Sequence, residues 1–187
     1  MKTKYITLSC ALATFLLISG CATKGNKDSS KDKESVTIEQ TDRGVEFRAS
    51  SAVFFDSGKS DLKSGATELL DKIADHLKNK TKNKSLVEGH TDNTGDESIN
   101  KTLSEVRALT VMKALIDRGV PKSKLDFKGH GSSVPIASND TADGRQLNRR
   151  TTILIIGEKK ENMSGFAKFL NAFNEKLRQL LDLIRGN

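Results

Sequence analysis

Two oppositely charged residues, Asp92 and Arg107, lie on either side of the start of an expected helix and could together bind a ligand that carries both charges. Residues 98–119 are expected to form this helix. Asn100, Ser104 and Arg107 follow one another at positions i, i+4 and i+7, so they share one helix face. Asp92 lies in the glycine-containing loop before the helix, near the amides of its first turn and the positive end of its dipole. The spacing therefore predicts a site that holds a carboxylate, a guanidinium and unpaired amides.

Such a site is suited to a zwitterion. Asp92 could hold an ammonium group while Arg107 binds a carboxylate through two parallel hydrogen bonds. Alternatively, Asp92 and Arg107 pair with each other or with solvent and bind nothing. The residues alone leave both interpretations open. The neighbouring acids Asp96 and Glu97 are interpreted as helix caps.

Residues suited to catalysis or metal binding are few. His90 and His130 follow glycines at two expected strand ends, and with a carboxylate such as Asp92 they could be imagined around zinc. No helical His-Glu pair at ligand spacing supports such a site. Ser132 and Ser133 follow a glycine-rich turn without the Gly-x-Ser-x-Gly pattern of a serine hydrolase. The sequence therefore predicts a protein that is not an enzyme and has no metal site and no cofactor.

The N-terminus is typical of a secreted, lipid-modified protein. A basic start precedes an almost uncharged apolar run over residues 5–18, which is too short to span a membrane comfortably as a mature helix. The run ends in the letters ISGC, which resemble the lipobox of bacterial lipoproteins, in which the cysteine is lipidated. By analogy with that family, Ala22 favours the outer over the inner membrane. We therefore expect residues 1–20 to be a signal peptide and Cys21 to carry the lipid; the alternative is a plain signal peptide with an incidental Cys21.

Composition limits the partners. The formal charge is +7, but one Tyr, no Trp and no interleaving of basic and aromatic residues argue against a nucleic-acid binder. Anionic cell-wall polymers are compatible with a charge of this sign. The two cysteines, Cys10 and Cys21, both belong to the predicted signal and lipid site. This excludes a disulfide or a cysteine-based site in the mature domain.

The chain is predicted to contain one folded domain between a tether and a helical tail. Residues 21–43 comprise the lipidated cysteine and a tether rich in Lys, Asp and Ser, residues 44–158 form the domain, and residues 159–187 form an amphipathic helical extension. Strands are expected at residues 45–49, 86–88, 125–128 and 151–156, with a short strand extension at 53–55, and helical segments at 66–77, 98–119 and 144–150. This alternation predicts an α/β fold: a two-layer sandwich of a mixed β-sheet with helices packed on it.

The tail helix, expected over residues 163–184, carries an apolar stripe. Its members are Phe166, Phe169, Phe173, Leu177, Leu181 and Ile184. The stripe could pack on the chain's own domain, bind a protein partner or lie on a membrane surface. A packed stripe makes the tail part of a simple tether, whereas an exposed stripe makes it a docking element.

Several short motifs follow one another in order. They are VEGHTDNTG at residues 87–95, then Asn100, Leu103-Ser104 and Arg107-Ala108, later Asn148-Arg149-Arg150, and, upstream, Phe55-Asp56-Ser57. Together they resemble the OmpA C-terminal-like domain, a family that includes the peptidoglycan-associated lipoproteins, over roughly residues 45–157. The resemblance implies non-covalent binding of peptidoglycan through the diaminopimelate of its stem peptide.

The resemblance also implies roles for individual residues. The free end of diaminopimelate carries an amine and a carboxylate on one carbon; by the match, Asp92 contacts the ammonium and Arg107 takes the carboxylate. Further positions match residues that line the family's pocket or form a basic wall beside it: Asp56, Thr94, Asn100, and Arg149 or Arg150.

These features predict a non-catalytic, lipid-anchored protein on the periplasmic face of the outer membrane. It would bind peptidoglycan, link the outer membrane to the cell wall, and have no nucleic-acid partner. The alternative function is an envelope scaffold whose main role is to dock a protein partner through the C-terminal helix.

Overall fold

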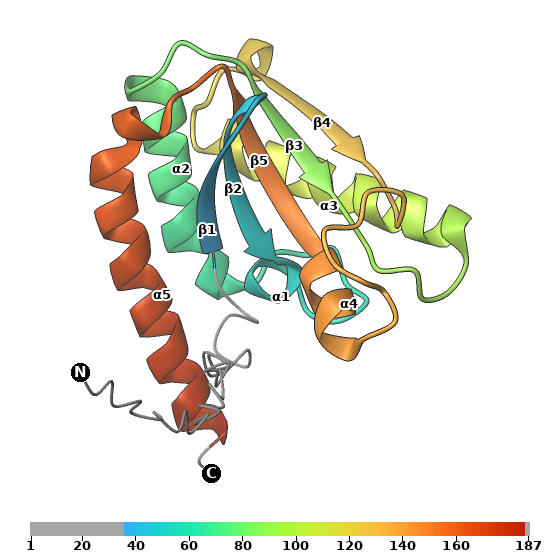
Figure 1. The fold of residues 1–187 in the computed structure, drawn as a ribbon. Coiled ribbons are helices and arrows are strands. Elements are labelled where there is room, and N and C mark those ends of the chain that lie inside the picture. The colour runs from blue at the N-terminus through green and yellow to red at the C-terminus, as the bar shows by residue number, and fades with distance from the viewer. Residues whose placement is uncertain (1–35, 186–187) are drawn as a thin grey trace, which may run out of the picture.

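One mixed β-sheet organises the protein (Figure 1). The computed structural model describes residues 36–185, in which the strand order is β1-β2-β5-β3-β4. All neighbours in this order are antiparallel except β3 and β4, which are parallel and joined through a crossover helix. The strands are β1 (Val36–Thr41), β2 (Gly44–Ser50), β3 (Ser85–Gly89), β4 (Leu125–Gly129) and β5 (Arg150–Ile156).

Helices cover one face of this sheet, which confirms the predicted two-layer α/β fold. α2 and α3 lie behind the sheet, and α5 runs alongside α2 and the edge strand β1 (Figure 1). The helices are α1 (Ser51–Phe54), α2 (Thr67–Asn79), α3 (Glu97–Asp117), α4 (Ala142–Asn148) and α5 (Ser164–Arg185), with short 3-10 turns η1 (Ser64–Ala66), η2 (Lys122–Lys124) and η3 (Lys160–Met163). None of the helices in the described residues is both long and apolar enough to span a membrane.

The core lies between the sheet and the helices. Alternate strand residues such as Phe47 and Ile153 point into it, and α2 and α3 contribute aliphatic faces that include Ile73 and Leu115. Each such large side chain contributes about 1.5–3 kcal/mol when fully buried. These buried side chains form one continuous hydrophobic cluster within the described residues.

α3 lies very close to the ends of β3 and β4. A Cβ atom at Gly89 would lie 2.1 Å from the carbonyl oxygen of Ser104, and one at Gly129 would lie 2.4 Å from the amide nitrogen of Glu105. The hydroxyl of Ser104 also accepts a 2.8 Å hydrogen bond from the amide of Gly131. These contacts fix the position over the strand ends of the α3 face that carries Asn100, Ser104 and Arg107.

The predicted boundary of the domain at residue 44 is too late. Residues 36–41, expected to belong to the tether, form the edge strand β1. The amide of Val36 donates to Oδ1 of Asn174 at 3.0 Å, and Nδ2 of Asn174 donates to the Val36 carbonyl at 2.8 Å. Because this partner lies in α5, the start of the strand depends on a contact that local sequence does not show.

The short strand extension expected at residues 53–55 was also wrong. Residues Ser51–Phe54 form the single-turn helix α1, and the Ser50 hydroxyl accepts from the amide of Ala52 at its start. Val53, Phe54 and Phe55 are buried in the core. Their apolar run reflects burial on several sides, which does not distinguish a strand from a helical turn.

The predicted apolar stripe of α5 packs on the chain's own domain: Phe169 and Leu177 are partly buried against the core, and Leu181 is half-buried. Phe166 lies with its ring centroid 4.5 Å from that of Phe47, and Leu170 and Phe173 are also buried. Further along the helix, Leu180 and Leu183 are exposed, but they lie beside the predicted stripe and are not members of it. The first half of α5 therefore packs on the chain's own domain, while the second half projects apolar side chains into solvent.

We expect Phe166→Ala to reduce the free energy of unfolding by about 3–5 kcal/mol, because it removes a buried ring at the contact between α5 and the sheet. Leu183→Ala, at an exposed position of the same helix, should change it by less than about 0.5 kcal/mol. Urea unfolding of both variants measures the difference. Equal stabilities would show that α5 does not pack on the sheet.

Candidate functional site

Most of the predicted site residues line one cavity. It has a volume of about 300 Å³ and lies among the residues that follow α1, the first half of α3 and the loop that follows β3. Five predicted residues contribute to its wall: Asp56, Asp92, Asn100, Arg107 and Arg149. The chain thus brings together side chains from segments far apart in sequence. Figure 1 shows α1, α4 and the loop that follows β3 at one end of the sheet, with α3 running behind the strands.

Arg107 is buried and held by groups that leave its charge unpaired. Its Nε donates a 2.9 Å hydrogen bond to the carbonyl of Lys59, and its guanidinium lies 5.2 Å from the centroid of the Phe55 ring. Burial, together with the nearby charge of Arg149, lowers the pKa of Arg107 below its ordinary value. In the part of the chain that the structure describes, its two terminal nitrogens donate to no protein acceptor and it forms no ion pair.

Asp92 pairs with Arg149 and not with Arg107. One carboxylate oxygen accepts a 2.9 Å hydrogen bond from the amide of Thr94, and the other lies 2.5 Å from Nη1 of Arg149. Burial opposes ionisation of Asp92, but the hydrogen bonds from Thr94 and Arg149 outweigh it and hold its pKa below the ordinary value. Asp92 is therefore an anion at neutral pH.

Asn100 and Thr94 join the loop to the helix. Nδ2 of Asn100 donates a 3.0 Å hydrogen bond to the carbonyl of Thr94. Since only the amide nitrogen can donate to a carbonyl, the amide oxygen of Asn100 remains an acceptor on the cavity wall. Thr94 is exposed and is not among the residues that line the cavity, but its backbone contacts both Asp92 and Asn100. Asp96 caps α3, as expected, by accepting from the amides of Ser98 and Ile99.

Asp56, Arg149 and Arg150 lie in different positions relative to the cavity. Asp56 is exposed at the rim, with Lys59 at 3.5 Å and Lys63 at 3.8 Å. Arg149 forms the basic wall of the cavity, whereas Arg150 turns away and donates to the carbonyls of Val134 and Asn148. Of the two arginines, Arg149 lines the cavity and Arg150 does not, so Arg149 is kept as the predicted basic wall.

Sequence reasoning missed the residues that position Arg107. Phe55 belongs to the Phe55-Asp56-Ser57 motif, but no local pattern predicts its contact with Arg107, and the Lys59 carbonyl is a backbone group without a side-chain signature. Leu103 lines the same cavity and supplies an apolar wall. Its place three residues after Asn100 on the helix could have indicated this.

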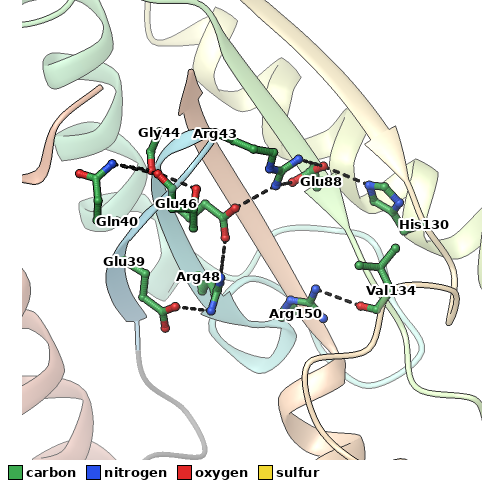
Figure 2. A network of polar contacts seen from close by, with 11 residues as sticks. Glu39, Gln40, Arg43, Gly44, Glu46, Arg48, Glu88, His130, Val134 and Arg150 are labelled. Atoms are coloured by element: carbon green, nitrogen blue, oxygen red, sulfur yellow. Dashed lines mark hydrogen bonds and ion pairs between the residues drawn. The ribbon is translucent and has the colours of Figure 1, made fainter. Parts of the chain in front are cut away.

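The face of the sheet opposite the helices carries a ladder of charges (Figure 2). Glu39 pairs with Arg48, Arg48 with Glu46, Glu46 with Arg43, and Arg43 with Glu88. The last rung is His130, whose Nε2 lies 3.1 Å from Glu88. Although Glu46 and Glu88 are buried, each carboxylate has a cationic partner, which offsets the cost of removing it from water.

Glu88, His90 and His130 form a group of potential metal ligands, but their geometry favours a structural role. Their ligand atoms all lie within 4.8 Å of one another. The two imidazole rings are stacked, with centroids 4.8 Å apart and planes 3° from parallel. In-plane lone pairs of parallel rings do not converge on one ion, and both oxygens of Glu88 accept from Arg43. The group is better described as the end of the charge ladder.

His90 makes stability sensitive to pH. Its burial, with the charges of Arg150 and His130, lowers the pKa of His90 to about 3. Between pH 6.5 and 3 the unfolded chain binds a proton at His90 that the folded chain does not bind, so stability falls as pH decreases through this window.

His90→Phe keeps a ring beside His130 but cannot titrate. On going from pH 7 to pH 5, we expect the free energy of unfolding of the wild type to fall by about 2 kcal/mol more than that of the variant. Urea unfolding at the two pH values measures this. A parallel decline in both proteins would contradict a neutral, buried His90.

Comparisons with known proteins place the chain in a family. Residues 54–149 match the sequence profile of the OmpA family. The chain is 36% identical over 156 residues to the outer-membrane lipoprotein YfiB of Pseudomonas aeruginosa, which covers 79% of this chain and 93% of that protein. It is 44% identical over 88 residues to the peptidoglycan-binding protein ArfA of Mycobacterium bovis, covering 47% of this chain and 27% of that protein.

A solved structure agrees with these matches. The cell wall anchor of the T6SS from Pseudomonas aeruginosa superposes with a TM-score of 0.59 at 29% identity, covering 65% of this chain and 87% of that one. The matched profile includes every residue that lines the cavity except Ser51 and Ala52. On the sequence profile, the relatives and the fold together, this chain belongs to the OmpA family.

Proposed function

We propose that this chain is a non-catalytic lipoprotein that binds peptidoglycan through the zwitterionic end of diaminopimelate and links the outer membrane to the cell wall. The observation that carries the proposal is the buried, unpaired guanidinium of Arg107. A buried charge without a partner is costly, and a ligand carboxylate that accepts two parallel hydrogen bonds would offset that cost. Lys59 and Phe55 hold the guanidinium in place for such a ligand.

The ammonium group of the ligand would lie between Asp92 and Asn100. Asp92 is ionised, and its pair with Arg149 leaves further lone pairs on the carboxylate. The amide oxygen of Asn100 supplies a neutral acceptor on the same wall. Arg149 lies near enough to Arg107 to lower the pKa of Arg107. The positive charge of Arg149 would therefore add to the attraction for the ligand carboxylate.

The membrane link is supported by sequence and by relatives. Cys21, the expected signal peptide and most of the expected tether lie outside the described residues. The P. aeruginosa relative is named an outer-membrane lipoprotein and the mycobacterial relative a peptidoglycan-binding protein. Several acyl chains on Cys21 would hold the protein at a bilayer, because each buried methylene contributes about 0.8 kcal/mol. With this anchor, the protein would be held in the outer membrane at one end and would bind the cell wall at the other.

The grip on the wall would come from many weak contacts. Two charge-assisted hydrogen-bonded contacts of about 1.5–3 kcal/mol each give a modest affinity for one stem peptide. Many copies of the protein on one membrane and many stems on one wall raise the overall strength through multivalency.

We expect Asp92→Asn and Arg107→Lys each to reduce binding to purified peptidoglycan at least about tenfold, since each removes one charge-assisted or bidentate contact. The matched controls are Asp126→Asn, on an exposed strand position, and Arg118→Lys, at the other end of α3. Co-sedimentation of residues 22–187, which include all of β1, with and without excess free diaminopimelate measures the effect.

Circular dichroism confirms that each variant is folded before it is tested. Binding by the wild type that free diaminopimelate does not reduce, or unchanged binding in both site variants, would rule out the zwitterion pocket.

A second candidate function is docking of an envelope protein through α5. The observation that favours it is the exposed Leu180, which lines a cavity of about 510 Å³ between α2 and α5 together with Phe173 and Leu177. Leu183, further along α5, is also exposed. An exposed apolar helix face next to a hollow is a typical helix-binding surface.

A photoreactive residue in place of Leu183 in the full chain tests this function in cells. Cross-links to one protein from position 183, and none from the exposed control position Leu147 on α4, are the expected result if α5 docks a partner. A chain that binds peptidoglycan but forms no specific cross-link at position 183 would link the membrane to the wall without docking a protein through α5.

A further inference from the structure

A second, uncharged groove lies beside the proposed binding pocket. Its volume is about 360 Å³. Six residues line it, and they offer only hydroxyl and aliphatic groups: Ser60, Ser98, Ile99, Thr102, Leu103 and Val106. A lining without charge favours a small aliphatic group over the ionic ends of a ligand.

The groove is continuous with the proposed pocket. Leu103 lines both of them, and Ser60 directly follows Lys59, whose carbonyl holds Arg107. On α3, Ile99 and Val106 each precede a pocket residue by one position, which places them about 100° further round the helix. A ligand that occupies the pocket would therefore reach the groove with its next chemical group.

No described part of the chain covers the groove. Ile99 is 66% exposed and Val106 is 40% exposed. A second copy of the protein is a poor occupant, because a stable interface needs about 800 Å² from each partner and this patch has two exposed aliphatic side chains. A single small side chain of the ligand can contact Ile99 and Val106 at this position, where it would fill only part of the groove.

We propose that this groove binds the methyl side chain of the D-alanine that follows diaminopimelate in the stem peptide. The inference rests on the proposed function, since it takes the zwitterionic end of diaminopimelate to lie in the pocket. Three methylenes separate that end from the peptide backbone of the stem. The residue joined to this backbone therefore lies outside the pocket, beside the aliphatic face of α3. The groove would make the protein distinguish stems by the residue next to diaminopimelate.

Two synthetic stem peptides that differ by one methyl group test the proposal. One ends in diaminopimelate–D-alanine and the other in diaminopimelate–glycine, so their charges are identical. Calorimetry with residues 22–187 should show about fourfold tighter binding of the D-alanine peptide, the effect of burying one methyl group. This comparison uses the wild type and needs no substitution.

Matched double variants locate the preference. Ile99→Ser with Val106→Ser should reduce the ratio of affinities to about one and leave the affinity for free diaminopimelate unchanged. The control, Ile136→Ser with Val134→Ser, changes the same residue types at 45% and 44% exposure away from the groove and should keep the fourfold ratio.

The failures of the two proposals are distinguishable. The groove proposal is overturned, while free diaminopimelate still binds, if the wild type has equal affinity for both peptides. It is also overturned if the fourfold ratio of affinities survives in the groove double variant or is lost in the control double variant. If free diaminopimelate and both peptides fail to bind, the pocket and the groove are overturned together.

Discussion

The close approach of α3 to Gly89 and Gly129 is the contact on which the proposed binding site depends. The backbone of the helix at Ser104 occupies the space that a side chain at Gly89 would fill. With its middle fixed there, α3 presents Asn100 and Arg107 one turn to either side, next to the loop that leaves β3. A larger residue at either glycine would lift the helix and move both polar groups away from Asp92. The two glycines at successive strand ends, which could suggest similar ligand-bearing loops, instead reflect helix packing.

The distribution of charge separates the site from the rest of the sheet. On the open face, every buried carboxylate of the ladder has an arginine or histidine partner, so that face is internally neutralised (Figure 2). In the pocket, Asp92 has a partner but the buried Arg107 has none among the described residues. The wall carries two aspartates and two arginines and is neutral overall, but the unpaired guanidinium of Arg107 attracts an anionic group. The acceptors at Asp92 and Asn100 favour a ligand that also carries a donor. This asymmetry is the physical basis for the proposal that the ligand is a zwitterion and not a simple carboxylate.

Local sequence patterns predicted the elements of the site better than their contacts. The shared face of Asn100 and Arg107 and the cap at Asp96 follow from helix periodicity and capping chemistry, and the structure confirms them. The partner of Asp92 did not follow from any pattern: Arg149 belongs to a distant segment and meets Asp92 only after β5 pairs with β3. Motif order, interpreted through family resemblance, pointed to Arg149 or Arg150 as a basic wall but not to a pair with Asp92.

The first strand and the tail were harder to predict because each depends on the other. Val36 begins β1 with both of its backbone groups bonded to Asn174 of α5, so the edge of the sheet is completed by the last helix. The tail is therefore part of the fold along its first half. The strand also shortens the expected tether to residues 22–35, which span at most about 50 Å when fully extended. Because α5 passes beside the start of β1, the exposed Leu180 and Leu183 lie past the point where the chain enters the domain. If Cys21 is anchored in the outer membrane, that half of α5 is held within one short tether of the bilayer, where a membrane-associated partner could reach it without releasing the wall.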